Sequence, residues 1–189
     1  MQRFGPAHPF YRRRKGLELR AEDEAEFREF ITAQMAPLRR LAYVTCGNWH
    51  MAEDAVANAL IRLYPRWRGL DRPDLYVRTA VYRAAIDETR RPWRRERPAG
   101  DALPDIPGAD PSAKTDERLR VLAALRQVPP KQRAAVMLRH YQGLSIEDTA
   151  RVLGCTVGNA KSQTSRGLTK LREMFEAQEN LEEWSHAAQ

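Results

Sequence analysis

Polar residues between positions 156 and 166 are of the types that read DNA. Amide, hydroxyl, ammonium and guanidinium groups pair with base edges or hold phosphates. The residues expected to contact DNA are Thr156, Asn159, Lys161, Ser162, Gln163, Ser165 and Arg166. A purely structural pair of helices would more often carry Glu/Lys pairs here. DNA binding is therefore favoured over a plain structural hairpin, which stays the alternative.

The sequence around these residues predicts a helix-turn-helix whose second helix enters the major groove. Ser145 is suited to cap a first helix, with Asp148 three residues later facing the exposed amides of its first turn. Gly154 suits the left-handed residue that stops this helix, and Thr156 can cap the second. A small residue such as Ala150 lets the two helices cross closely.

A second basic stretch, over residues 74–97, combines arginines with aromatic rings. Arginines that hold phosphates beside rings on which unpaired bases stack form a single-strand-binding composition. The arginines are Arg78, Arg83, Arg90, Arg91, Arg94, Arg95 and Arg97, and the rings are Tyr76, Tyr82 and Trp93, with Trp67 upstream. For any single ring the commoner role is to fill a helical core, so that alternative stays open for each ring.

The composition of the chain indicates which kinds of partner to expect. The 189 residues carry a net charge of +7 and a pI of about 9.8, which fits a polyanionic partner. No apolar run approaches the roughly 20 residues that span a bilayer, and the first residues lack the apolar stretch of a secretory signal. Two cysteines, Cys46 and Cys155, are expected to be free thiols. We therefore expect a cytoplasmic protein without membrane contact.

Catalytic chemistry is not predicted. The histidines are scattered, the carboxylates do not cluster as a metal site requires, and no Gly-rich loop could cradle a phosphate. Cys46 and His50 lie four residues apart, yet Gly47 and Asn48 between them indicate a turn, and no second ligand pair lies nearby. We expect no catalytic residue, metal, cofactor or small-molecule substrate, and an enzyme acting on nucleic acid is the least favoured interpretation.

Apolar residues recur every three to four positions, which predicts an all-α protein of two small helical domains. Helices are expected over about 22–46, 51–67, 74–91, 119–128 and 131–141, followed by the helix-turn-helix. Pro37 is expected to kink or restart the first helix, and Tyr141 and Val157 to point inward. The expected layout is a mobile basic arm (1–21), a first domain (22–97), a flexible acidic linker rich in Pro and Gly (98–113), a helix-turn-helix domain (114–175) and an acidic tail (176–189).

This order of features resembles the extracytoplasmic-function (ECF) sigma factors, the smallest sigma subunits of bacterial RNA polymerase, and especially the branch common in actinobacteria. Residues 41–64 and 74–91 resemble the family's second conserved region. Residues 125–133, which end in Pro-Pro-Lys-Gln-Arg, resemble the fourth region together with the helix-turn-helix. The resemblance covers residues 27–172 and implies a non-enzymatic factor that binds core polymerase, melts promoter DNA and initiates transcription.

The resemblance also implies roles for the residues that match. The polymerase clamp helices and flap would be bound, with Asp54, Asn58 and Arg62 on the clamp. The −10 element would contact Trp67, Tyr76, Arg83, Asp87, Arg90, Arg91, Trp93 and Arg94, while the recognition helix reads the −35 element. An anti-sigma factor is a further candidate partner. The alternative function is a stand-alone helix-turn-helix regulator with an N-terminal sensing or dimerisation domain.

Several positions depart from the family pattern. Ala57-Asn58 replaces the usual Gln-Glu pair on the polymerase face, and Arg83 stands where the family often has Asn. In the recognition helix Gln163 replaces a common Arg, and Asn159 replaces a common Thr. Arg most often reads guanine, whereas Gln and Asn pair with adenine. We therefore expect a −35 element shifted toward A·T at the position that faces Gln163.

Overall fold

The computed structural model describes residues 21–90 and 113–187, and the elements within them are helices. They are α1 (Ala21–Cys46), α2 (Trp49–Leu63), the 3-10 helix η1 (Tyr64–Gly69), α3 (Pro73–Thr89), α4 (Ala113–Gln127), α5 (Pro130–Val136), the π-helical turn η3 (Met137–Tyr141), α6 (Ile146–Leu153) and α7 (Val157–Ala187). The predicted all-α class is confirmed. The expected basic arm and linker lie almost entirely outside the described residues, as do Arg91, Trp93 and Arg94.

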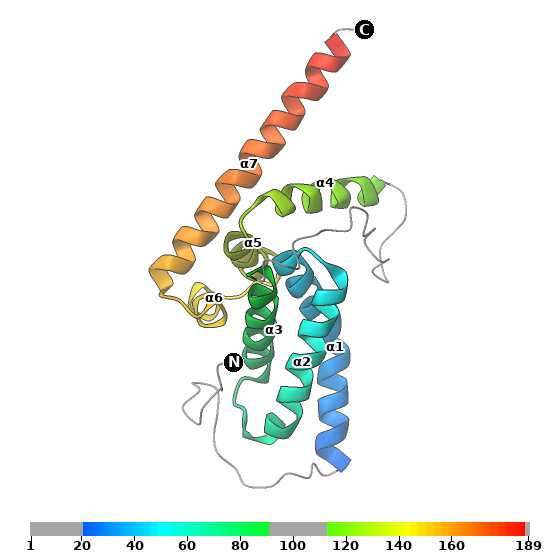
Figure 1. Cartoon of the computed structure of the whole chain (residues 1–189), viewed down its shortest axis with the longest axis vertical. Helices are drawn as coiled ribbons and strands as arrows, with labels where there is room; N and C mark the ends of the chain where they lie inside the picture. The colour runs from blue at the N-terminus through cyan, green and yellow to red at the C-terminus, as the bar shows by residue number, and fades with distance from the viewer. Residues whose placement is uncertain (1–20, 91–112, 188–189) are drawn as a thin grey trace.

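The first half of the molecule consists of α1, α2 and α3, which lie side by side (Figure 1). Their facing sides bury an apolar core in which Leu38, Leu41, Leu63, Leu75 and Val81 are each at most 1% exposed. Burial of such side chains is worth about 1.5–3 kcal/mol each relative to exposure. This three-helix core therefore gives α2 and α3 a firm base from which their outer faces can bind partners.

Local sequence signals set the ends of these helices. The Asn48 side chain accepts a 3.0 Å hydrogen bond from the Met51 amide and so begins α2. Pro65 lies in the first turn of η1, where it ends the regular α2 helix at Leu63. By contrast, α1 runs through Pro37 as a single helix up to Cys46. The restart expected as one possibility at Pro37 does not occur; α1 packs against α2 and α3 as one continuous helix.

The second half consists of α4 to α7 and has a smaller core of its own. The buried members of that core are Ala124, Val128, Val136 and Leu171. α7 crosses α5 closely at Gly167, where an added Cβ would lie 2.7 Å from Val136 Cγ2 and 3.1 Å from the Gln132 carbonyl oxygen. Glycine is required here because there is no room for a side chain. Its backbone has ordinary helical geometry, so its conformational freedom is not the reason.

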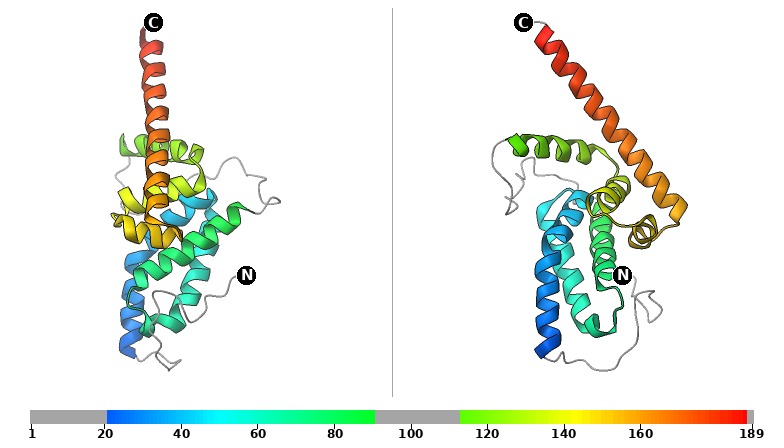
Figure 2. Two further views of the ribbon diagram at one scale, coloured as in Figure 1. Left: turned by 90° about the vertical axis from the view of Figure 1, so that its left-hand side faces the viewer. Right: turned by 180° about the vertical axis from the view of Figure 1, so that it is seen from behind.

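The two halves pack against each other. α5 lies against α1, and α6 lies beside α3 (Figures 1 and 2). One contiguous apolar core includes α1, α2 and α3 together with Ala134, Met137, Leu138 and Val152 of the second half. α7 begins next to α6, and its C-terminal part extends away from the rest of the molecule (Figure 2). It is a continuous helix to Ala187 and so includes most of the segment expected as an acidic tail.

Two expectations about the second half are wrong. Tyr141 was expected to point inward, but its helix ends as a π turn in which the Gln142 amide donates a 2.9 Å hydrogen bond to the Met137 carbonyl. A π turn holds more residues than an α turn, which rotates Tyr141 outward and leaves it 56% exposed. Val157 was also expected to point inward, but it occupies the first turn of α7 and is 37% exposed.

Candidate nucleic-acid interface

Local caps and one left-handed glycine build the helix-turn-helix. Ser145 Oγ accepts a 3.0 Å hydrogen bond from the Asp148 amide at the start of α6. Gly154, with φ 66° and ψ 40°, ends α6 in the left-handed conformation that glycine adopts without strain. Thr156 Oγ1 accepts a 3.2 Å hydrogen bond from the Asn159 amide at the start of α7. The caps predicted from the sequence are confirmed, and they fix how α7 leaves the turn.

The first turns of α7 present a polar surface to solvent. The exposed residues are Thr156, Asn159, Lys161, Ser162, Ser165 and Arg166, whereas Gln163 is half-buried. Ala160 and Thr164, on the inner side of the same turns, are buried. The residues predicted to contact DNA therefore lie together on the turn and the first part of α7, outside the core that holds it.

The amides of Gln163 and Asn159 are joined on this surface. Gln163 Nε2 donates a 3.2 Å hydrogen bond to Asn159 Oδ1. Gln163 keeps its second Nε2 hydrogen and its Oε1 atom for another partner. The remaining Nε2 hydrogen can pair with the N7 acceptor of adenine, and Oε1 can accept from its N6 amino group in the major groove. The geometry is thus compatible with the adenine preference expected from the sequence.

The predicted strand-binding residues on α3 divide between the surface and the core. Arg83, Asp87 and Arg90 are exposed, and Arg90 Nη1 lies 4.0 Å from Asp87 Oδ1. Tyr76 is only 2% exposed and belongs to the core. In this conformation its ring fills the core and cannot stack on a base, so Tyr76 takes the role that was its alternative. Arg83 and Asp87 are the exposed residues of α3, and Arg90 is exposed at its C-cap.

Two other aromatic rings near α3 also pack against other parts of the protein. The half-buried Trp67 ring packs against Phe27, at 5.2 Å between centroids, and against Phe30, at 4.9 Å. Tyr82 is 5% exposed. The pKa of Tyr82 is raised to about 12, mainly by burial and in smaller part by Cys155, while Arg90 opposes the increase. Because Cys155 belongs to the second half, Tyr82 lies where the two halves meet.

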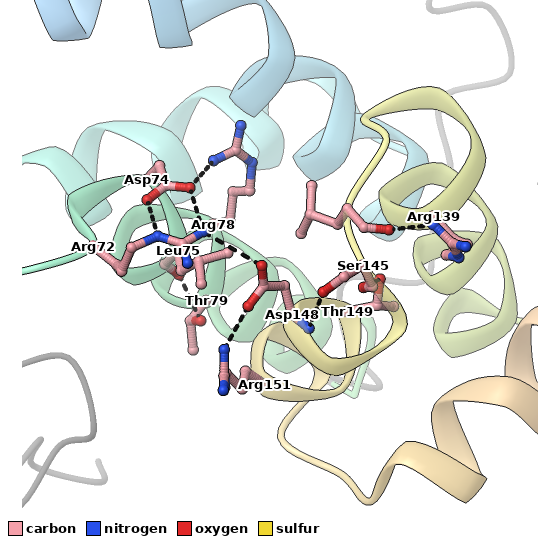
Figure 3. Close-up of polar contacts among 11 residues, drawn as sticks. Arg72, Asp74, Leu75, Arg78, Thr79, Arg139, Ser145, Asp148, Thr149 and Arg151 are labelled. Atoms are coloured by element: carbon pink, nitrogen blue, oxygen red, sulfur yellow. Dashed lines mark hydrogen bonds and ion pairs between the residues drawn. The ribbon is translucent and has the colours of Figure 1, made fainter.

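A chain of opposite charges links α3 to α6 (Figure 3). Asp74 lies between two arginines, with Arg72 Nε at 3.3 Å from Oδ1 and Arg78 Nη1 at 3.4 Å from Oδ2. Arg72 Nη2 also lies 3.4 Å from Asp148 Oδ2, and Arg151 Nη1 lies 2.6 Å from Asp148 Oδ1. Burial lowers the pKa of Arg78, an effect that Asp74 opposes. Asp148, predicted only as part of the α6 cap, therefore also connects the two halves.

The outer side of α2 carries the predicted polymerase contacts and an exposed isoleucine that the sequence pattern did not single out. Asp54, Asn58 and Arg62 are exposed there. Ile61 follows Asn58 by three positions and is 70% exposed. The available signal was an isoleucine on the polar side of an amphipathic helix. A large apolar group exposed beside polar ones is typical of a protein-binding surface.

Within residues 21–90 and the described side chains of the second half, no group of three or more His, Cys, Asp and Glu could hold a metal ion. Burial raises the pKa of both free thiols, Cys46 and Cys155. Among the helices that the structure describes, none combines the length and apolarity needed to cross a membrane.

Known proteins resemble both halves of the chain. Residues 118–171 match the family model for Sigma-70, region 4. The chain is 33% identical over 158 residues to the RNA polymerase sigma-E factor of Streptomyces avermitilis, covering 82% of this chain and 87% of that protein. It is also 33% identical over 157 residues to the ECF RNA polymerase sigma factor SigM of Mycobacterium tuberculosis, covering 82% and 80%.

Two solved structures share the fold. The sigma factor RpoE of Bartonella quintana, in complex with the anti-sigma factor NepR, superimposes with a TM-score of 0.64 at 22% identity and covers 80% of this chain and 97% of that one. CnrH, in complex with the cytosolic domain of CnrY, superimposes with a TM-score of 0.55 at 21% identity and covers 82% and 90%.

Proposed function

This chain belongs to the ECF sigma factors of RNA polymerase, and we propose that it directs core polymerase to promoters by reading a −10 and a −35 element. A sigma factor acts in transcription initiation. The observation that carries the proposal for this chain is the polar surface at the start of α7, held outward by the capped helix-turn-helix.

The −35 element is assigned to α7. Asn159 and Gln163 would read base edges through their joined amides. Lys161 and Arg166, both exposed, would hold phosphates and contribute the sequence-independent part of the affinity. Thr156, Ser162 and Ser165 supply hydroxyl groups around them. This division predicts that base preference and overall affinity can be changed separately.

The −10 element is assigned to the accessible part of α3 and the segment after it. Arg83 and Arg90 are exposed and would contact the phosphates of an unpaired strand, with Asp87 between them. Arg91, Trp93 and Arg94, which lie outside the described residues, complete the assignment made from the sequence. Flipping a base from the duplex costs a few kcal/mol, which binding to polymerase and strand together would offset.

Core polymerase is assigned to α2, and an anti-sigma factor is proposed as a second protein partner. Asp54, Asn58 and Arg62 are exposed on the same side of α2 as the exposed Ile61, and together they form a surface that combines one apolar group with charged and polar ones. NepR, in the similar complex, is an anti-sigma factor. A partner of that kind would regulate this chain in the cytoplasm, where it would meet polymerase.

Run-off transcription with purified core polymerase and a library of genomic promoter fragments tests the proposed function. We expect RNA from a subset of fragments only when the chain is present, and co-purification of the chain with polymerase. Lys161→Ala combined with Arg166→Ala should reduce RNA from all of them, because phosphate contacts are lost at every sequence. Failure of the unmodified chain to bind polymerase or to start RNA at any fragment would refute the proposal and favour a stand-alone regulator.

A further inference from the structure

A carboxylate lies in the middle of the surface that is assigned to the −10 strand. Asp87 is on α3, four positions after Arg83 and three before Arg90. Side chains at these spacings are neighbours on one side of a helix, and the three residues cover about 10 Å of its length. All three are exposed. A strand that contacts both arginines would therefore pass directly over Asp87.

Neither the helix nor a phosphate of the strand accounts for this negative charge. Asp87 belongs to the last turn of α3, where the helix macrodipole disfavours an acidic side chain. A DNA phosphate held by either arginine would also be repelled by a carboxylate beside it. The ion pair between Asp87 Oδ1 and Arg90 Nη1 is 4.0 Å long, and its side chains are 68% and 66% exposed. An exposed ion pair of this kind contributes little to stability.

A carboxylate accepts hydrogen bonds, and the bases of an unpaired strand offer donors on their Watson–Crick edges. Guanine has two donors side by side on this edge, N1–H and the N2 amino group, which match the two oxygens of a carboxylate. Adenine and cytosine each place one amino group beside an acceptor nitrogen. Thymine places one N3–H between two acceptor oxygens. A second carboxylate oxygen would be repelled by these acceptors, so guanine is the base that satisfies both oxygens.

The position of Asp87 suits this role. A separation of 4.0 Å is too long for a hydrogen bond, so Arg90 offsets the charge of the carboxylate and leaves its lone pairs for another donor. Ala85 and Ile86, which directly precede Asp87, are buried in the core of α1, α2 and α3. Their burial fixes the direction in which the Asp87 side chain leaves the helix. A reading group on a rigid helix discriminates between bases better than one on a loop.

We infer that Asp87 reads guanine at one position of the unpaired −10 strand, while Arg83 and Arg90 hold the phosphates on either side of it. This inference rests on the proposed function, since it names the base that the −10 site takes. The carboxylate accepts from N1 and from the N2 amino group of the guanine. The two arginines offset its repulsion of the strand. Asp87 is thus a specificity-determining residue of the −10 site.

Inosine tests this contact from the DNA side, because it is guanine without the N2 amino group. The chain is combined with core polymerase and with labelled single strands that carry the −10 element of an active promoter fragment. Guanine, inosine, adenine, cytosine or thymine is placed at each −10 position in turn, and fluorescence anisotropy measures the affinity. At one position we expect guanine to bind about tenfold more tightly than inosine, which is equivalent to about 1.4 kcal/mol.

Asp87→Asn separates base reading from simple repulsion, because the two predict changes of opposite sign. Loss of base reading should weaken binding of the guanine strand about tenfold and remove its advantage over inosine. Loss of repulsion alone would tighten the binding of every strand by the same factor. Folding should be unaffected, since Asp87 is exposed. Glu29→Gln, at an exposed position of α1, is the matched control for the loss of one negative charge and should keep the preference for guanine over inosine.

Two results would overturn the inference. The first is equal binding of guanine and inosine at every −10 position. The second is an Asp87→Asn variant that binds all strands more tightly and keeps the guanine preference of the unmodified chain. Absence of both strand binding and RNA with the unmodified chain and core polymerase would instead refute the proposed function, and the inference with it. The two failures are distinguishable, because the first two results leave strand binding and RNA synthesis intact.

Discussion

Arg133 Nη2 donates a 2.9 Å hydrogen bond to the carbonyl oxygen of Thr45, which lies 88 positions earlier in the chain. Thr45 is in the last turn of α1, where carbonyl groups have no partner within the helix and carry partial negative charge. The guanidinium also donates at 3.4 Å to the Arg126 carbonyl oxygen. One buried arginine of α5 thus joins the end of α1 to the end of α4.

Replacing Arg133 with methionine keeps much of its length and removes its donors. The free energy of unfolding should fall by about 2–3 kcal/mol, since a hydrogen bond to a charged group is lost and the Thr45 carbonyl stays buried. Urea denaturation followed by circular dichroism measures this change. Arg172→Met, at an exposed position of α7, should change stability by less than about 0.5 kcal/mol. Equal effects of the two substitutions would show that the Arg133 contact contributes no stability.

Substitution by alanine should change the stability in opposite directions at two glycines of α7. Gly167→Ala places a Cβ 2.7 Å from Val136 Cγ2 and 3.1 Å from a backbone oxygen, so we expect destabilisation by about 1–3 kcal/mol. Gly158→Ala meets no atom within 4 Å and should stabilise the helix by up to about 1 kcal/mol. Thermal denaturation of the two variants measures both changes. A gain in stability at Gly167 would mean that α5 and α7 are farther apart than the structure has them.

Tyr82 should make the protein less stable at high pH. Its pKa is about 12 in the folded chain but about 10 once unfolded, because folding buries the phenol. Between these values the unfolded chain has lost a proton that the folded chain keeps, so the free energy of unfolding falls as pH rises. The protonated Tyr82 phenol therefore contributes about 2–3 kcal/mol to the free energy of unfolding. This contribution is present in full below about pH 10 and is lost by about pH 12.

Urea denaturation of Tyr82→Phe at about pH 8 and about pH 12 tests this assignment. The variant should lose less stability between the two conditions than the unmodified chain does, because phenylalanine has no proton to release. Identical losses in both proteins would show that another group causes the alkaline destabilisation.

Sequence patterns predicted the elements that depend on nearby residues. Ser145, Gly154 and Thr156 form the predicted caps because a cap involves atoms within a few positions of each other. Periodicity failed at Tyr141, since it assumes a constant 3.6 residues per turn and a π turn interrupts that spacing.

The docking of the two halves was not predictable from such patterns. Gln142 reaches partners 64 and 105 positions away, and its residue type alone does not indicate which backbone carbonyl it will contact. Tyr76 illustrates the same limit for the candidate site. An aromatic residue beside arginines fits a stacking surface, yet the packing of α3 against α1 and α2 buries this ring.

The recognition helix should separate base reading from phosphate binding. Gln163→Ala should cost about 1–3 kcal/mol of discrimination at one −35 position, whereas Lys161→Ala should weaken binding to all sequences alike. Selection of bound promoter sequences, with the salt dependence of each affinity, measures the two effects. An unmodified chain that prefers guanine at the position facing Gln163 would refute the adenine assignment.

Ile61, on the exposed side of α2, should contribute to affinity for core polymerase. Ile61→Asp places a charge where an interface would exclude water, and a buried charge without a partner is costly. We expect at least about a tenfold loss of affinity for polymerase, equivalent to about 1.4 kcal/mol. The fold should be unaffected because Ile61 is 70% exposed.

Ala33→Asp, at an exposed position of α1, is the matched control for added charge. Surface plasmon resonance with immobilised polymerase measures both. Unchanged affinity in Ile61→Asp would show that polymerase does not cover this exposed residue of α2, although it lies one turn from Asn58.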